Sequence, residues 1–86
     1  MKTRHSFVTR SLQTFIVTMK IEPDTDDDRR LLIDAFDREE KSMERLVNNH
    51  IASYVQNAFP GMKLIKADHE KYPTILKVYL EQARQN

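Results

Sequence analysis

The sequence contains no cysteine and only one glycine among its 86 residues. Without cysteine the chain forms no disulfide and no thiolate metal site, which is typical of a protein in a reducing compartment. A single glycine argues against a glycine-rich phosphate-binding loop. The longest uninterrupted apolar run is three residues, whereas a membrane-spanning helix needs roughly 20. We therefore expect a cytoplasmic protein with no contact to a membrane.

What is present indicates one small globular domain. Hydrophobic residues make up 40% of the chain and charged residues 31%, a balance typical of folded rather than disordered proteins. A chain of this length buries only a modest core, so such domains often need a partner or a second copy.

The net charge of +1 conceals a segregation along the chain. Residues 1–22 have a net charge of +3, residues 23–46 of −4 and residues 47–86 of +2. Nucleic acid responds to the charge of a local face rather than to the total, so a basic N-terminal segment is compatible with nucleic-acid binding. Taken alone, these charges are better explained by simple solvation of exposed cations.

The first 22 residues predict a basic arm followed by one strand. Residues 1–13 show no sustained periodicity, and we interpret them as a flexible arm. Residues 14–21 are rich in β-branched and aromatic types and alternate with period two, which predicts a strand. One of its faces carries Phe15, Val17, Met19 and Ile21, and the other carries Ile16, Thr18 and Lys20.

Helical periodicity begins after the acidic run of residues 24–28. Those residues suit the N-terminal end of a helix better than a metal site, because they lack the spacing and the central glycine of a calcium loop. We predict helices over residues 26–38 and 43–59, with Ser42 as the N-cap of the second. Pro60-Gly61 ends the second helix. A short extended segment over 62–67 and a third helix from Pro73 to Ala83 complete the prediction.

A lone strand leaves its backbone groups without partners. Either the C-terminal segment or a second copy of the chain has to supply the neighbouring strand. Both alternatives are open at this point.

Three segments resemble the ribbon-helix-helix family of DNA-binding proteins, and are nearest to its Arc-like branch. They are Val17-Thr18-Met19-Lys20-Ile21, the stripe Leu31-Leu32-Ala35-Phe36, and the run that begins Lys41-Ser42-Met43-Glu44-Arg45 and ends at Val55. The resemblance covers roughly residues 14–58. Glu40 stands where the family often has glycine, and the link around Pro23 is about two residues longer than usual.

The resemblance implies a mainly α fold with one short strand per chain: an intertwined homodimer with a two-stranded antiparallel ribbon. It divides the chain into an arm (1–13), the DNA-binding domain (14–59) and a C-terminal extension with a helix (60–86). The ribbon of this family inserts into the DNA major groove. The implied dimer core comprises Phe15, Val17, Met19, Ile21, Leu32, Phe36, Leu46, Val47, Ile51 and Tyr54.

The resemblance also implies three sets of DNA contacts. Bases would be read by Ile16, Thr18 and Lys20, and a phosphate would be held by Lys41, Ser42 and Met43 at a helix N-terminus. The arm would contact DNA through Lys2, Arg4 and Arg10.

The function expected from this resemblance is a sequence-specific transcriptional repressor of phage, plasmid or bacterial type that binds double-stranded DNA as a homodimer. One alternative is an antitoxin whose residues 62–86 bind a toxin protein. Another is a plasmid or relaxosome accessory protein. We expect no enzyme activity, cofactor or metal, since no nucleophile–base spacing is visible and the histidines are scattered.

Overall fold

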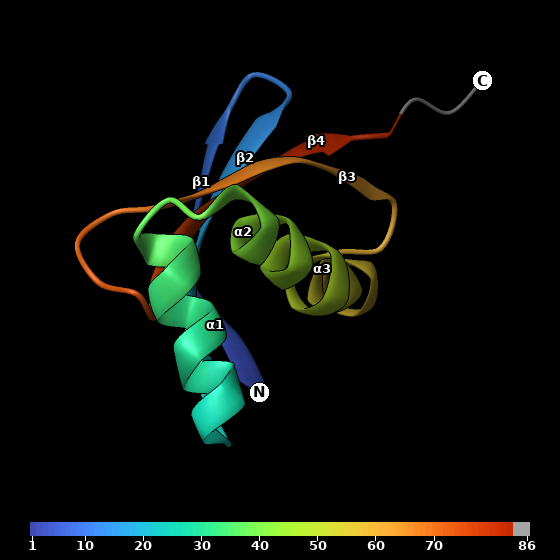
Figure 1. Ribbon diagram of the computed structural model, residues 1–86. Coiled ribbons are helices and arrows are strands. Elements are labelled where there is room, and N and C mark those ends of the chain that lie inside the picture. The colour runs from blue at the N-terminus through green and yellow to red at the C-terminus, as the bar shows by residue number, and fades with distance from the viewer. Residues whose placement is uncertain (84–86) are drawn as a thin grey trace.

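The chain forms two β-hairpins with a pair of helices between them (Figure 1). The computed structural model describes residues 1–83. Its elements in chain order are β1 (Lys2–Ser11), β2 (Thr14–Glu22), α1 (Asp26–Phe36), α2 (Glu40–Leu46), the π-helical turn η1 (Val47–Ile51), α3 (Ala52–Ala58), β3 (Met62–His69) and β4 (Ile75–Gln82).

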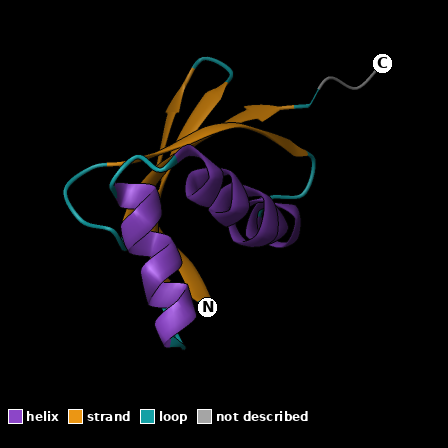
Figure 2. Ribbon diagram, in the orientation of Figure 1, coloured by secondary structure: helices purple, strands orange, loops and turns teal. Residues whose placement is uncertain are grey.

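The four strands form one antiparallel sheet in the order β1-β2-β4-β3. The first and last hairpins therefore meet through β2 and β4, which are the central strands, while β1 and β3 are the edges. All helices lie on one side of this sheet, as Figure 2 shows, so the fold has two layers.

The central strands carry the core because their alternation is uninterrupted. Val17, Met19 and Ile21 of β2 are fully buried, and so are the three alternate residues of β4 that pack beside them. These β4 residues are Leu76, Val78 and Leu80. Leu32, Leu46 and Ile51 close the core from the helical layer. A sheet with one packed face and one solvated face produces this pattern.

The helices begin and end at residues suited to those positions. Thr25 is the N-cap of α1, and its hydroxyl accepts a hydrogen bond from the backbone N–H of Asp28 at 3.1 Å. After α1 the chain turns through Arg38, whose φ is 66°. The helical layer then continues from Glu40 to Ala58 through α2, η1 and α3.

Both edge strands contain a β-bulge, and neither alternates cleanly. The register shifts between His5 and Phe7 in β1 and between Leu64 and Lys66 in β3. A bulge adds one unpaired residue and moves the following side chains to the other face. β1 is also held to the helical layer by His5, whose Nδ1 lies 2.7 Å from the Tyr54 hydroxyl and whose ring lies 4.8 Å from that of Phe59.

The ribbon-helix-helix interpretation is wrong. The strand over 14–21 and the helix from residue 26 are confirmed as β2 and α1. However, β2 has strands of its own chain on both sides, so no backbone edge remains for a second copy to pair with. The fold is α/β with a four-stranded sheet, not mainly α with one strand per chain.

Two segments were assigned the wrong structure. Residues 2–11, expected within a flexible arm, form β1. The helix expected from Pro73 to Ala83 is instead β4. The expected helical stripe was Ile75, Leu76, Tyr79, Leu80 and Ala83, but Leu76, Val78 and Leu80 also alternate with period two, and this second set is the one that the sheet buries. Residues 84–86, the end of the expected C-terminal extension, lie outside the described residues.

The residues expected in a dimer core form the interior of one chain. Val17, Met19, Ile21, Leu32, Leu46 and Ile51 are buried, and Phe15, Val47 and Tyr54 pack against them in part. Phe36 is half-buried at the end of α1. The hydrophobic pattern was therefore correctly identified as core, but the core is complete without a second copy.

Candidate nucleic-acid interface

The face of the sheet opposite the helices is uncovered, and we call it the open face. Paired residues on neighbouring strands point to the same side of a sheet, so the register identifies its members. They are Lys2, Arg4, Phe7, Thr9 and Ser11 of β1; Thr14, Ile16, Thr18, Lys20 and Glu22 of β2; Ile75, Lys77, Tyr79 and Glu81 of β4; and Lys63, Lys66 and Asp68 of β3.

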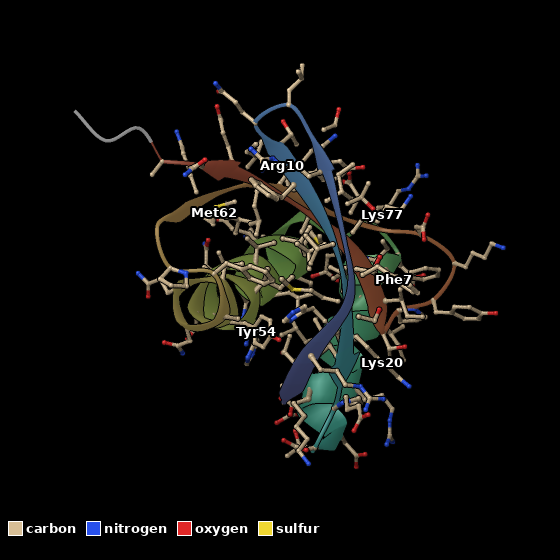
Figure 3. The ribbon with its side chains drawn as sticks, turned by 180° about the vertical axis from the view of Figure 1, so that it is seen from behind. Phe7, Arg10, Lys20, Tyr54, Met62 and Lys77 are labelled. Carbon is tan, nitrogen blue, oxygen red and sulfur yellow. The ribbon has the colours of Figure 1, made fainter. Side chains whose placement is uncertain are left out.

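Apolar and aromatic side chains occupy the middle of the open face. Phe7 pairs with Thr18, and Ile16 pairs with Tyr79 in the adjacent row. Phe7 is 71% exposed, a large value for a phenylalanine in a regular strand. Figure 3 shows Phe7, Lys20 and Lys77 on one side of the strands, and Tyr54 and Met62 on the other. From strand and row spacings, the Cα atoms of Phe7 and Tyr79 are about 12 Å apart.

Cations surround this centre. The open face carries six lysine and arginine side chains and three carboxylates. Three of its cations are in ion pairs: Arg4 with Glu22 at 3.2 Å, Lys66 with Asp68 at 3.6 Å, and Lys77 with Glu70 at 2.8 Å. Exposed ion pairs of this kind contribute little to stability. A ligand with stronger negative charge can therefore replace the carboxylates as the partner of these cations.

Two lysines of the open face have further contacts that bear on ligand binding. The Lys66 ammonium lies 4.7 Å from the centre of the Tyr79 ring, within cation–π distance. The hydrogen bond and charge of Glu70 hold the pKa of Lys77 above its usual value. Lys77 therefore stays cationic on the open face, and Lys66 lies directly beside the aromatic centre.

Charge separates the two layers of the molecule. The strands carry seven lysines and arginines against three carboxylates, whereas residues 23–58 carry five against nine. The charge segregation found along the sequence thus becomes a difference between the sheet and the helical layer. A polyanion is attracted to the sheet and repelled by the helices.

The predicted DNA contacts are divided between these layers. The predicted base-reading residues Ile16, Thr18 and Lys20 lie on the open face, and so do the expected arm residues Lys2 and Arg4. Arg10 points to the other side, where it pairs with Phe15 and its guanidinium lies 5.3 Å from the ring centre.

The predicted phosphate site at Lys41, Ser42 and Met43 lies in the helical layer, away from the open face. Ser42 was expected to be an N-cap, but it is inside α2 and only 6% exposed. The N-cap is Glu39, whose side chain makes no capping hydrogen bond. Met43 packs against the core. The three residues therefore do not join the other predicted contacts in one site.

Sequence reasoning missed Phe7, Lys66, Lys77 and Tyr79 as open-face residues. Phe7 follows a bulge, which hid the period of β1. Lys77 and Tyr79 could have been found, because they alternate with Leu76, Val78 and Leu80. Lys66 follows the second bulge, in β3.

The described residues contain no group of three or more histidine, cysteine, aspartate or glutamate side chains placed to hold a metal ion. Within residues 1–83, every helix is too short or too polar to cross a membrane.

Comparison with known proteins gives no relative. No family model matches the chain, and searches of curated proteins and of solved structures found no match.

Proposed function

We propose that the open face binds single-stranded nucleic acid. The observation that carries the proposal is an aromatic and apolar centre, Phe7, Ile16 and Tyr79, on an uncovered sheet bordered by cations. Aromatic side chains on a four-stranded sheet provide stacking surfaces for unpaired bases, while cations neutralise the phosphates.

The width of the sheet favours single strands over duplex. Three inter-strand spacings of about 4.8 Å place the edge strands about 14 Å apart, and side chains add to this width. The major groove of B-DNA is about 12 Å wide. The four-stranded sheet is therefore too wide to enter the groove as a two-stranded ribbon does.

Each part of the open face has a distinct role in the proposed complex. Phe7 and Tyr79 stack on two bases, and the Thr18 hydroxyl between their strands bonds to a base or sugar. Lys20 and Lys77 contact phosphates on either side of the bound strand. The ammonium of Lys66 leaves the Tyr79 ring for a phosphate when a base stacks there. Repression and toxin binding came from the family resemblance, which the fold overturns, and they form no part of this proposal.

Fluorescence anisotropy with labelled oligonucleotides tests the proposal. We expect a mixed-sequence 12-nucleotide single strand of DNA or RNA to bind more tightly than a duplex of the same sequence, with affinity that falls as salt rises. The variant Lys20→Glu/Lys66→Glu should lose about tenfold or more in affinity, since each lost phosphate contact removes both charge and counterion release.

The matched control is Lys41→Glu/Arg45→Glu, which changes the net charge equally but in α2. It should change affinity by less than about threefold, because screening limits the reach of an exposed charge to about 10 Å. Equal losses in the two variants would show attraction to the whole molecule and not a site. Absence of single-strand binding at low salt would refute the proposal.

A further inference from the structure

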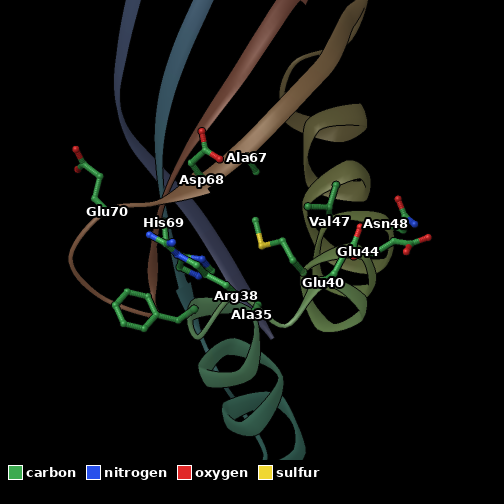
Figure 4. Close-up of a pocket in the computed structure, with 12 residues that line it drawn as sticks. Ala35, Arg38, Glu40, Glu44, Val47, Asn48, Ala67, Asp68, His69 and Glu70 are labelled. Carbon is green, nitrogen blue, oxygen red and sulfur yellow. The ribbon is translucent and has the colours of Figure 1, made fainter.

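A furrow runs along the outer edge of β3, between this strand and the helical layer. Its larger part has a volume of about 940 Å³ and lies between the end of β3 and the helices α1 and α2 (Figure 4). Its smaller part, about 390 Å³, lies between the start of β3 and α3. Asn48 lines both parts, so the two cavities adjoin, one at each end of β3.

The strand that forms one wall has an unpaired edge. β3 is the last strand of the sheet and pairs only with β4 within the described residues. Its outward backbone N–H and C=O groups are free to pair with another strand. An edge strand beside a groove is the arrangement in which an extended peptide adds a strand to a sheet.

The opposite wall is helical and contains the π-helical turn. Val47 and Asn48, the first residues of η1, line the furrow together with Met43 of α2. Such turns frequently interrupt helices at functional sites. The floor of the larger part is apolar and includes Phe36, whose ring meets that of His69 edge-on at 5.4 Å.

The charges that line the larger part of the furrow favour a basic ligand. Its lining contains four carboxylates and a single cation, Arg38. Glu40 and Glu44 form no ion pair within the described residues, whereas Asp68 and Glu70 pair with open-face lysines. An extended segment with lysine or arginine fits this arrangement, since its aliphatic stem would lie on the apolar floor and its charge would reach Glu40 and Glu44.

We propose that the furrow binds an extended basic peptide, which adds to the edge of β3 as a fifth strand. This inference does not rest on nucleic-acid binding, because the open face and the furrow share only Asp68. The probe is a library of random 12-residue peptides displayed on phage and selected on the full chain, with the enriched peptides then synthesised. Enrichment of lysine and arginine beside β-branched residues is the expected result.

Binding of the synthesised peptides to variants locates the site. Glu40→Lys/Glu44→Lys should weaken binding about tenfold or more, because charge-assisted contacts would become repulsive. Asp26→Lys/Asp27→Lys, which makes the same change of charge at the N-terminal end of α1, should leave affinity within about twofold. That end lies about 14 Å along the helix axis from Phe36, farther than the roughly 10 Å over which exposed charges are screened. Phe7→Ala/Tyr79→Ala should also bind normally.

Hydrogen exchange of the β3 amides supplies a second readout. Bound peptide should slow exchange at amides of residues 66–69 in the unsubstituted chain and not in Glu40→Lys/Glu44→Lys. Selection of acidic peptides, no enrichment, or protection elsewhere would overturn the proposal. Concentration-dependent protection without peptide would also overturn it, because a second copy would then occupy the edge.

Discussion

The two faces of one sheet differ in almost every physical property. Neighbouring residues of β4 make the contrast plain: Leu80 is fully buried under the helices, while Tyr79 stands on the open face beside Lys66. The covered face is apolar and packed by the chain itself. The open face mixes aromatic, apolar and cationic side chains that no described segment of the chain covers. The difference separates residues that fold the protein from residues free to bind.

The largest expected difference between the faces is in stability. Leu80→Ala should lower the free energy of unfolding by about 2–5 kcal/mol, because it leaves a cavity in a closed core. Tyr79→Ala should lower it by only about 0.2–1 kcal/mol, the range for one cross-strand pair. Urea denaturation of both variants measures this difference. Similar losses would mean that the open face is also packed, and therefore that something covers it.

The next effect concerns stacking on the open face. Phe7→Ala and Tyr79→Ala should each weaken binding of a single-stranded 12-mer by about 1–3 kcal/mol, which is the usual loss per stacked base. Anisotropy titrations at fixed salt measure it. Tyr54→Phe, on the covered side, is the control and should bind with unchanged affinity. An unchanged affinity for both alanine variants would exclude stacking.

A smaller effect should appear in the salt dependence. Lys20→Ala removes one phosphate contact, so the slope of log affinity against log salt should decrease by about 0.7 for a single strand. Lys41→Ala, in the helical layer, should leave the slope unchanged. The slopes come from titrations at several salt concentrations. A shallower slope for Lys41→Ala would place the nucleic acid on the helices instead.

The smallest effect lies on the covered face, in the response to pH. Burial, opposed by the Pro73 carbonyl and by Asp68, lowers the pKa of His69 from its usual 6.5. The unfolded chain therefore binds a proton at His69 more readily than the folded chain does. The stability that neutral His69 contributes is complete above pH 6.5 and is lost as pH falls below that value.

Thermal denaturation between pH 7.5 and 5.5 measures this contribution. His69→Gln keeps a donor for the Pro73 carbonyl, which His69 Nε2 meets at 3.0 Å, but cannot be protonated. We expect its melting temperature to fall less with acidification than that of the unsubstituted chain. Parallel curves would contradict the role given to His69.

The sequence predicts the centre of the molecule better than its edges. The alternation of β2 and the N-terminal end of α1 are local signals, and both were read correctly. The edge strands carry bulges at Ser6 and Ile65, which break period two and remove the only local signal of a strand. The sequence of β4 fits both the helical period and the strand period of two. Pairing with β2, which lies more than 50 residues away in the chain, makes this segment a strand.

The candidate site was predicted only in part for the same reason. Ile16, Thr18 and Lys20 lie on the open face because β2 was placed correctly, although they were assigned to a ribbon that does not exist. Tyr79 and Lys77 join them through the long-range pairing of β4 with β2. Their alternation with Leu76, Val78 and Leu80 signals a strand, but it does not say which strand is the neighbour. The expected N-cap at Ser42 is wrong because Glu40, and not Met43, begins the helix.

The most direct test of the account is a heteronuclear NMR titration of the chain with a single-stranded 12-mer. We predict chemical-shift changes at Phe7, Thr18, Lys77 and Tyr79, with little change in α1 and α2. Changes confined to the helical layer, or no changes at concentrations that saturate weak complexes, would contradict nucleic-acid binding by the open face.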